Sequence, residues 1–171
     1  MPRNIELKAR VDNIQALLSS ASAVADAGPT ILVQDDTFFS CPYGRLKLRT
    51  FNADKGELIF YQRPNETGPK ESTYCIVETS SPDLLRDLLT SAYGQIGLVR
   101  KTRMLFLSGR TRIHLDQVEG LGDFMELEVV LSPSETAEAG VKIAIELLTK
   151  LGIREESLVS GAYLDLMKNP R

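Results

Sequence analysis

Apolar and polar residues alternate with a period of two along several stretches of this chain, which is the pattern of strands with one buried face. The first stretch is Arg3–Val11, where every second residue from Ile5 onward is apolar. Its opposite face carries polar residues only, namely Asn4, Glu6, Lys8 and Arg10. A solvated outer face with cross-strand ion pairs accounts for one such strand, so the interpretation depends on whether the pattern recurs.

The same charged face recurs in four later stretches that also predict strands. Residues 44–51, 100–107 and 109–118 carry bases at alternate positions, and residues 124–131 carry two acids on one face. With the first strand, these faces hold nine bases: Lys8, Arg10, Arg45, Lys47, Arg49, Lys101, Arg103, Arg110 and Arg112. The other polar side chains beside them are Glu6, His114, Asp116, Glu126 and Glu128.

So many bases would repel one another on one sheet unless an anion neutralised them, so the pattern predicts a site for a multiply charged ligand. Glu6, Glu126 and Glu128 are hard oxygen donors of the kind that hold Mg²⁺ or Mn²⁺ while substrate phosphates supply further oxygens. A closed barrel would give these faces a common interior.

Further strands and turns complete this sheet. Residues 30–39, 58–62 and 72–78 predict three more strands, which brings the total to about eight. Residues 120–123 read as a hairpin turn rather than a phosphate loop, because strands flank them and no helix follows. Of the remaining polar residues, Lys70 is expected to be solvated.

Three helices are predicted between or after the strands. The first is capped by Asp12 and ends before Gly28-Pro29, and the second spans residues 82–93. A capping box at residues 132–135 opens the third, which extends to about residue 151. The residues expected on buried helix faces are Leu84, Leu85, Leu88, Leu89, Val141, Ala144, Ile145 and Leu148. A last segment around Tyr163 predicts a docking helix that covers the barrel.

These elements predict an α+β protein, an antiparallel, mostly closed eight-stranded β-barrel with helices packed outside. A length of 171 residues suits one domain over residues 1–171. With 20 basic and 23 acidic residues the net charge is −3, which argues against a nucleic-acid partner. Cys41 and Cys75 lack metal-ligand spacing, and without a long apolar run we expect a cytoplasmic protein with no membrane partner.

Two motifs resemble the CYTH superfamily, also called triphosphate tunnel metalloenzymes. The start of the first strand, residues 4–8, is similar to the E-x-E-x-K signature. Residues 109–131 resemble the longer G-L-G-x-F-x-E-L-E block of the class IV adenylyl cyclase-like and thiamine triphosphatase-like branch. Residues 35–39, Arg49 and residues 101–103 resemble shorter elements of the family, so the likeness covers nearly the whole chain.

The resemblance implies roles for the charged residues. It assigns phosphate contacts to Lys8, Arg49, Lys101, Arg103 and Arg112, with Arg45, Lys47 and Arg110 in reserve. It assigns one or two divalent ions to Glu6, Glu126 and Glu128. Asp116 would orient a base or complete the metal shell. His114 either moves a proton near neutral pH or holds a neighbouring carboxylate by a hydrogen bond.

Two positions depart from the family pattern. Asn4 stands where the first glutamate of the signature is usual, so a metal ligand has become an amide. Gln62 stands where many members have the lysine of a K-x-P element, and Arg63 beside it is expected on the other face of its strand. Asp35 and Asp36 form a turn, pair with a basic strand, or touch the ligand.

Three functions follow from this pattern. The first is a metal-dependent enzyme acting on ATP, thiamine triphosphate or tripolyphosphate, either as a phosphohydrolase or as a cyclase of the class IV type. The second is a binding module for a triphosphate or polyphosphate that has lost turnover through the changes at Asn4 and Gln62. The third is a structural barrel whose charges pair internally. The sequence does not predict the oligomeric state or the group attached to the phosphates.

Overall fold

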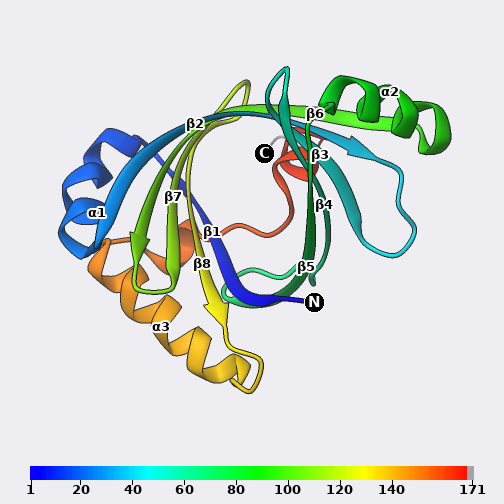
Figure 1. Cartoon of the computed structure of the whole chain (residues 1–171). Coiled ribbons are helices and arrows are strands. Elements are labelled where there is room, and N and C mark those ends of the chain that lie inside the picture. The colour runs from blue at the N-terminus through cyan, green and yellow to red at the C-terminus, as the bar shows by residue number, and fades with distance from the viewer. Residues whose placement is uncertain (169–171) are drawn as a thin grey trace.

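Eight antiparallel strands form one closed ring in the computed structural model, which describes residues 1–168 (Figure 1). Their order around the ring is β1-β5-β4-β3-β2-β6-β7-β8, and β8 pairs back with β1. The strands are β1 Arg3–Val11, β2 Ala27–Phe39, β3 Arg45–Asn52, β4 Lys55–Gln62, β5 Lys70–Thr79, β6 Gln95–Ser108, β7 Thr111–Val118 and β8 Gly122–Leu131. The predicted eight-stranded antiparallel barrel is therefore confirmed.

Helices lie outside this ring. In Figure 1, α1 and α3 cover the wall formed by β1, β7 and β8, whereas α2 lies beyond β3 and β6 on the other side. The helical elements are η1 Ile14–Leu17, α1 Leu18–Val24, α2 Pro82–Tyr93, α3 Ala137–Lys150, η2 Glu155–Ser157 and α4 Tyr163–Lys168. The chain therefore has the α+β composition expected from its sequence.

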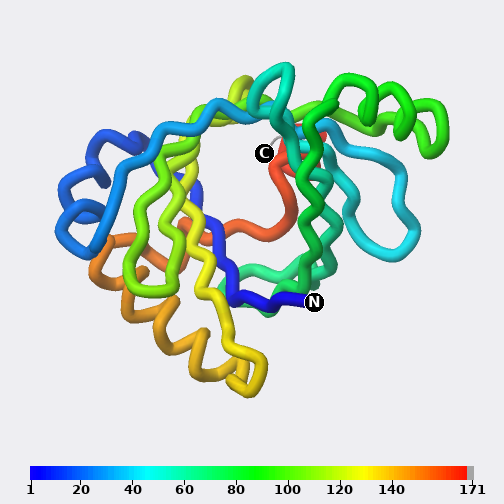
Figure 2. Tube along the Cα trace, in the orientation of Figure 1, coloured from blue at the N-terminus to red at the C-terminus, as the bar shows by residue number. Residues whose placement is uncertain are grey.

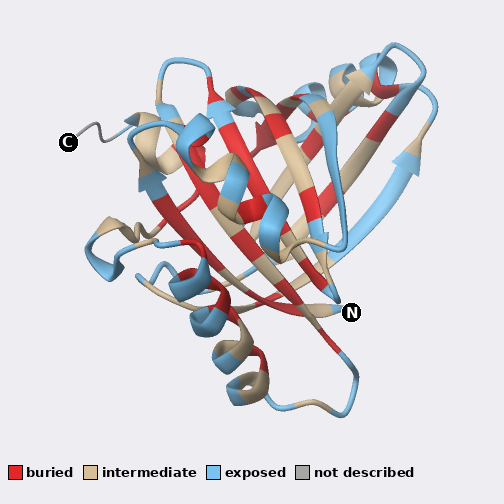
Figure 3. Ribbon diagram, turned by 90° about the vertical axis from the view of Figure 1, so that its left-hand side faces the viewer, coloured by how far each residue is buried: buried red, intermediate tan, exposed pale blue. Residues whose placement is uncertain are grey.

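The largest hydrophobic core lies between the barrel and the helices, not inside the barrel. Ile5 and Leu7 on the outer face of β1 are fully buried, and they belong to one cluster with Ala144 and Leu148 of α3. Buried positions in Figure 3 follow the strands in alternation with less buried ones. The apolar stripe of each strand therefore packs outward, which leaves the charged stripe facing inward.

Strand register brings opposite charges next to each other on the inner face. Along the β1–β8 pair, Lys8 stands opposite Glu126 and Glu6 stands opposite Glu128. Directly opposite side chains of an antiparallel pair lie close enough to interact. The charged residues of separate sequence motifs thus become neighbours through strand pairing.

The C-terminal segment closes one end of the barrel. β1 pairs with β5 only at residues 3–6, and farther along its free edge Lys8 O accepts a hydrogen bond from Val159 N at 2.9 Å. From there the chain crosses the barrel to α4, as Figure 2 shows. An apolar cluster fills this end, formed by Phe38, Val99, Val118, Phe124, Tyr163 and Leu164. The expected docking helix is therefore present.

Helix starts differ from the predicted ones. The first helical segment is capped by Asn13, not Asp12, because the Asn13 side chain accepts from Gln15 N. Helix α1 ends at Val24, and Gly28-Pro29 lies within β2. Helix α3 begins at Ala137, because residues 132–135 form a separate turn and Thr136 caps the helix.

Helix burial also differs from the predicted faces. Leu84 and Leu88 of α2 are 70% and 58% exposed, and only Leu89 is buried among the four leucines. In α3, Ile145 is exposed, whereas Leu147 is buried. Each helix rests on the barrel along a narrower stripe than its apolar pattern suggests. In the part of the chain that the structure describes, no helix has the length and hydropathy needed to span a membrane.

Gly140 permits the close contact between α3 and the barrel wall. A Cβ at this position would lie 2.6 Å from both Ile5 Cγ1 and Leu131 Cδ2. Gly140→Ala should therefore destabilise the fold by about 1–3 kcal/mol, although alanine alone favours an exposed helix by about 1 kcal/mol. Urea unfolding measures this difference. The exposed Lys142→Ala variant is the control and should change stability by less than about 0.5 kcal/mol.

Candidate functional site

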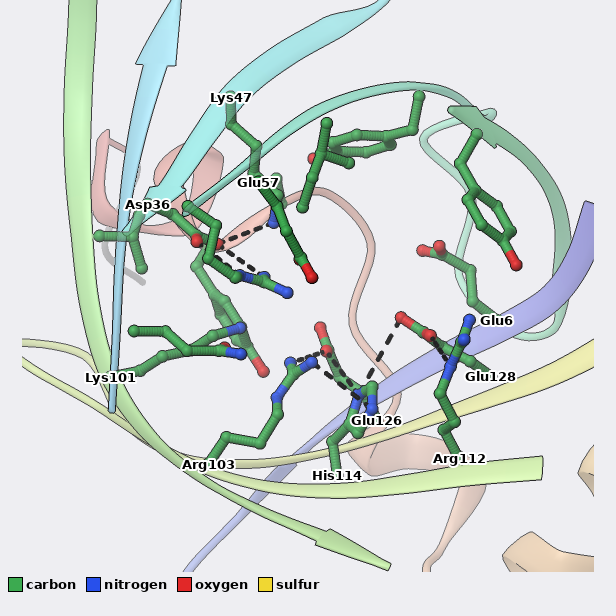
Figure 4. A pocket seen from close by; sticks show the side chains of 18 of the residues that line it. Glu6, Asp36, Lys47, Glu57, Lys101, Arg103, Arg112, His114, Glu126 and Glu128 are labelled. Atoms are coloured by element: carbon green, nitrogen blue, oxygen red, sulfur yellow. Dashed lines mark hydrogen bonds and ion pairs between the residues drawn. The ribbon is translucent and has the colours of Figure 1, made fainter. Parts of the chain in front are cut away.

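A cavity of about 300 Å³ lies inside the barrel and receives side chains from all eight strands (Figure 4). Its basic lining residues are Lys8, Lys47, Arg49, Arg63, Lys101, Arg103 and Arg112. Its acidic lining residues are Glu6, Asp36, Glu57, Glu126 and Glu128. Seven bases and five acids leave the lining with excess positive charge, although the whole protein is acidic.

Asp36 on β2 anchors the basic side chains of β3. Its carboxylate accepts hydrogen bonds from Lys47 Nζ at 2.7 Å and from Arg49 Nε and Nη2 at 2.8 and 2.9 Å. Burial acts to raise the pKa of Asp36, but Arg49 and Lys47 outweigh it and hold the pKa well below its usual value. Asp36 therefore pairs with a basic strand, whereas Asp35 lies outside and pairs with Arg100 at 3.4 Å.

Asp116 on β7 anchors the basic side chains of β6 in the same way. Arg103 donates to it through Nε and Nη2 at 2.7 and 2.6 Å, and Lys101 Nζ lies 3.2 Å away. The Tyr163 hydroxyl of α4 donates to the same carboxylate at 2.8 Å. Asp116 is fully buried, and burial acts to raise its pKa, but Arg103 and Lys101 outweigh burial and lower the pKa. Its position fixes Arg103 and Lys101 rather than contacting the cavity.

Glu126 joins this network to β1. It lies 2.8 Å from Lys8 Nζ and accepts a hydrogen bond from Arg103 Nη2 at 2.6 Å. The Lys8 ammonium also lies 3.6 Å from the centre of the Tyr163 ring. Arg103 thus links two carboxylates, Asp116 and Glu126, and all of these groups are held in fixed positions.

One group of side chains has the donors and spacing of a metal site. His114, Glu126 and Glu128 each offer a ligand atom within 4.8 Å of the others. His114 Nδ1 is buried, accepts or donates no hydrogen bond among residues 1–168, and lies 3.6 Å from Glu126 Oε2. Burial, followed by Arg103, lowers the pKa of His114, which favours a neutral imidazole. Burial acts to raise the pKa of Glu128, but neighbouring bases lower it to about 2, so the carboxylate is ionised.

Glu6 lies beside this group but outside it. Its carboxylate pairs with Arg63 Nε at 2.8 Å. Burial and the nearby Glu128 and Glu126 raise the pKa of Glu6, although Arg63 opposes them. Among the three predicted metal ligands, the structure brings Glu126 and Glu128 together, and adds His114 in place of Glu6.

Two predicted phosphate-binding residues do not line the cavity. Arg110 precedes β7, is exposed, and pairs with Glu135 in the turn before α3. The alternating pattern predicts that Arg110 belongs to the strand, but residues 109–110 form a turn and β7 begins only at Thr111. Arg45 lies at the end of β3, where it bonds Asp165 of α4 at 2.7 Å. The predicted phosphate contacts of Arg110 and Arg45 are therefore not supported by their positions, since neither side chain lines the cavity.

The inner face of β4 is the reverse of the predicted one. Gln62 is exposed and donates to Tyr43 O, whereas Arg63 faces the cavity and its side chain is 4% exposed. The change at Gln62 therefore removes no base from the interior. Counting every second residue from Glu57 predicts that Arg63 faces inward, because Glu57, Ile59 and Arg63 all line the cavity.

Lys70 is a second basic residue that sequence reasoning missed. It is buried rather than solvated, and it stands opposite Glu6 in the β1–β5 register. Burial, followed by Arg63, lowers its pKa to about 8. The signal was weak because Lys70 starts its strand, directly after a turn-rich loop.

A closed eight-stranded barrel with a basic cavity and a carboxylate–imidazole group places the chain in the class of barrel proteins with a charged interior. The comparison with family models gives this class its name. The CYTH domain model matches residues 2–163, so the chain belongs to the CYTH domain family.

Individual relatives agree with this assignment. Adenylate cyclase CyaB of Aeromonas hydrophila is 24% identical over 95% of this chain and 87% of its own. The PH1012 protein of Pyrococcus horikoshii has a TM-score of 0.86 and 25% identity, covering 96% of this chain and 99% of its own. The Hippeastrum protein HpAC1, for which a dominant triphosphatase activity is recorded, has a TM-score of 0.70 and 15% identity, covering 100% of this chain and 97% of its own.

Removing the Asp36 carboxylate should destabilise the barrel in a pH-dependent way. Asp36→Asn leaves Lys47 and Arg49 without their anion, at a cost of about 3–5 kcal/mol at pH 7. The folded-state pKa of Asp36 is lowered, so its contribution is present above pH 4 and is lost as the pH falls below that value.

Urea unfolding between pH 7 and pH 2.5 measures this effect, with the exposed Asp54→Asn as the control. The difference between wild type and Asp36→Asn should shrink as the pH falls. A difference that stays constant over this range would contradict the assigned role of Asp36.

Proposed function

We propose that this protein is a metal-dependent enzyme that binds the phosphate chain of a triphosphate inside the barrel and acts on one of its phosphoanhydride bonds. The observation that carries the proposal is the convergence of seven Lys and Arg side chains on one cavity in an acidic protein. Such a cavity attracts and concentrates anions. The adenylate cyclase and triphosphatase names of its relatives support the same substrate class.

The interior ion pairs leave capacity for such an anion. Asp36, Asp116 and Glu126 each pair with two bases, and Arg103 is common to two of them, so three negative charges serve five positive ones. An arginine has five N–H donors and a lysine has three, and the carboxylates occupy only some of them. Phosphate oxygens would accept from the remaining donors, and the planar guanidinium suits two bonds to one phosphate.

The proposed phosphate contacts are Lys8, Arg49, Lys101, Arg103 and Arg112, together with Lys47 and Arg63 from the same cavity lining. Asp116 is a positioning residue, because Arg103, Lys101 and Tyr163 occupy its carboxylate. The network that Asp116 maintains holds the donors in place before the substrate arrives. Donors fixed in advance lower the cost of binding and of charge development in the transition state.

The group of His114, Glu126 and Glu128 fits a divalent cation. Its two ionised carboxylates are hard oxygen donors, and the buried Nδ1 of its imidazole has no hydrogen bond to any residue that the structure describes. The imidazole favours Mn²⁺ over Mg²⁺, which prefers an all-oxygen shell. A cation bound here would neutralise negative charge that develops on the phosphate oxygens.

A binding module without turnover is the second candidate. Asn4 supports it, because a neutral amide replaces an acid where the family signature usually has one, and its buried Oδ1 accepts no hydrogen bond within the described part of the chain. Gln62 no longer supports it, since its side chain faces outward.

A substrate panel tests the proposal. Tripolyphosphate, ATP and thiamine triphosphate are each incubated with Mg²⁺ or Mn²⁺, and phosphate, pyrophosphate and cyclic nucleotide are measured. Release of phosphate indicates hydrolysis, whereas pyrophosphate with cyclic AMP indicates cyclisation. Binding without either product would favour the binding module. An interior that is only structural would bind none of the three in calorimetry.

The metal assignment predicts different results for two neighbouring glutamates. Glu128→Gln should abolish most of the gain in tripolyphosphate affinity that Mn²⁺ gives, because it removes a charged ligand from the group. Glu6→Gln is the matched control and should keep this gain, since Glu6 pairs with Arg63 instead. Calorimetric titrations with and without Mn²⁺ measure both. Loss of the gain in both variants would return Glu6 to the metal site.

Triphosphate binding should be coupled to proton uptake through Lys101. Burial, followed by Arg103, lowers the pKa of Lys101 to about 7, so at pH 8 most of the lysine is neutral before binding. A bound anion raises this pKa, so affinity should fall as the pH rises from 7 to 9.

Titrations at pH 8 in buffers of different ionisation enthalpy measure the protons taken up. Lys101→Arg, which stays charged, should take up fewer protons than wild type. Equal uptake by the two proteins would show that Lys101 is already protonated in the free state.

A further inference from the structure

Several strands extend past their neighbours in the ring, because the strands of a closed barrel are staggered. Most of these overhanging edges are covered or blunted. The edge of β1 bonds the C-terminal segment through Lys8 O and Val159 N. The edge of β6 packs against α4, where Leu164 meets Gly97. The part of β2 that lacks a β3 partner contains Pro29, which has no N–H to donate. Such features keep a strand edge from pairing with another chain.

The edge of β5 lacks this protection. From Cys75 to Thr79, β5 pairs with β4 on one side, whereas its pairing with β1 ends at Thr73. Figure 1 shows β5 continuing past the start of β1 toward α2. This stretch contains no Pro, Lys or Arg, and its register with β4 is regular. Ile76 is 45% exposed and Val77 is 58% exposed. The edge is therefore open to a further strand.

Main-chain groups on this edge point toward the missing strand. Tyr74 N donates to Pro2 O on the β1 side at 3.1 Å. Along an antiparallel strand, both main-chain groups of every second residue point to the same side. Ile76 and Glu78 therefore direct N–H and C=O to the open side, where no described residue pairs with them. These are the groups that a strand added to a sheet edge would bind.

We propose that two copies of this protein associate by pairing their β5 edges antiparallel, about a two-fold axis at Val77. Ile76 exchanges main-chain hydrogen bonds with Glu78 of the partner subunit, and the symmetry repeats this exchange on the other side of the axis. The two Val77 side chains meet on the outer face, where β-branched pairs stabilise a sheet. A two-fold pairing uses both edges and closes, so it yields a dimer rather than a filament.

The edge itself selects this register and a second copy as its occupant. An axis at Ile76 would require the main chain of Tyr74, which Pro2 already occupies. An axis at Glu78 would place two carboxylates opposite each other. An axis at Val77 avoids both conflicts and sets no like charges directly opposite. Because Ile76 also lines the cavity, the pairing places Glu78 of the partner subunit against the cavity wall.

Two substitutions test the association by sedimentation velocity over a wide range of protein concentration. Wild type should shift from monomer to dimer as the concentration rises. Glu78→Pro should remain a monomer, because it removes an N–H of the open edge and no hydrogen bond to β4. Val77→Lys should also remain a monomer, because it sets two charges opposite each other on the axis. Thermal unfolding checks that both variants fold.

Matched controls distinguish the β5 edge from other exposed apolar surfaces. Val33 of β2 and Leu88 of α2 are 63% and 58% exposed, close to the value for Val77. Val33→Lys and Leu88→Lys should therefore keep the wild-type association. Loss of the dimer in Leu88→Lys, with retention in Val77→Lys, would assign the contact to α2 and overturn the proposal.

Disulfide cross-linking tests the register. Val77→Cys in a Cys75→Ser background should form a dimer under mild oxidation, since the two Cα atoms on the axis lie about 4.5 Å apart. Wild-type Cys75 is the control and should not cross-link, because four residues of offset separate it from its copy by about 13 Å. Cross-linking through Cys75 instead would overturn the register. A wild type that stays monomeric at every concentration would overturn the proposal as a whole.

Discussion

The carboxylate of Asp116 is the contact on which the interior depends. It is fully buried and binds Arg103, Lys101 and Tyr163, so it joins β6, β7 and the C-terminal helix at one point. Arg103 extends the network to Glu126, and Glu126 extends it to Lys8 of β1. Without this anion, several buried positive charges would repel one another, and the barrel would lose its closed end together with its binding groups.

A charged interior is possible because the apolar core lies elsewhere. The outer faces of β1, β7 and β8 pack against α1 and α3, and a smaller cluster packs beneath α2. Folding therefore takes its hydrophobic stabilisation from the outside of the barrel. The inside remains free to hold ion pairs, a metal group and a ligand, and its residues can vary in chemistry while the core holds the fold.

Sequence alternation predicted most of the fold and most of the site. β1 and α2 have the predicted bounds, and the predicted inner faces of β3, β6, β7 and β8 line the cavity. The wrong predictions concern residues at the ends of strands or in the turns next to them. Arg110 lies just before its strand, and Arg63 and Lys70 lie at strand ends where the face is hard to count. At such positions, membership of a strand depends on hydrogen bonds with a partner strand, which is often distant in sequence.

By itself, the sequence determined which residues share a strand face, because side chains alternate strictly along an extended chain. It also determined the excess of bases on those faces and the family motifs. Only the tertiary structure decided which acid meets which base, since the register of β1 against β8 and of β6 against β7 sets those pairs. It likewise decided that His114 joins Glu126 and Glu128 while Glu6 pairs with Arg63, because these contacts join segments far apart in the chain.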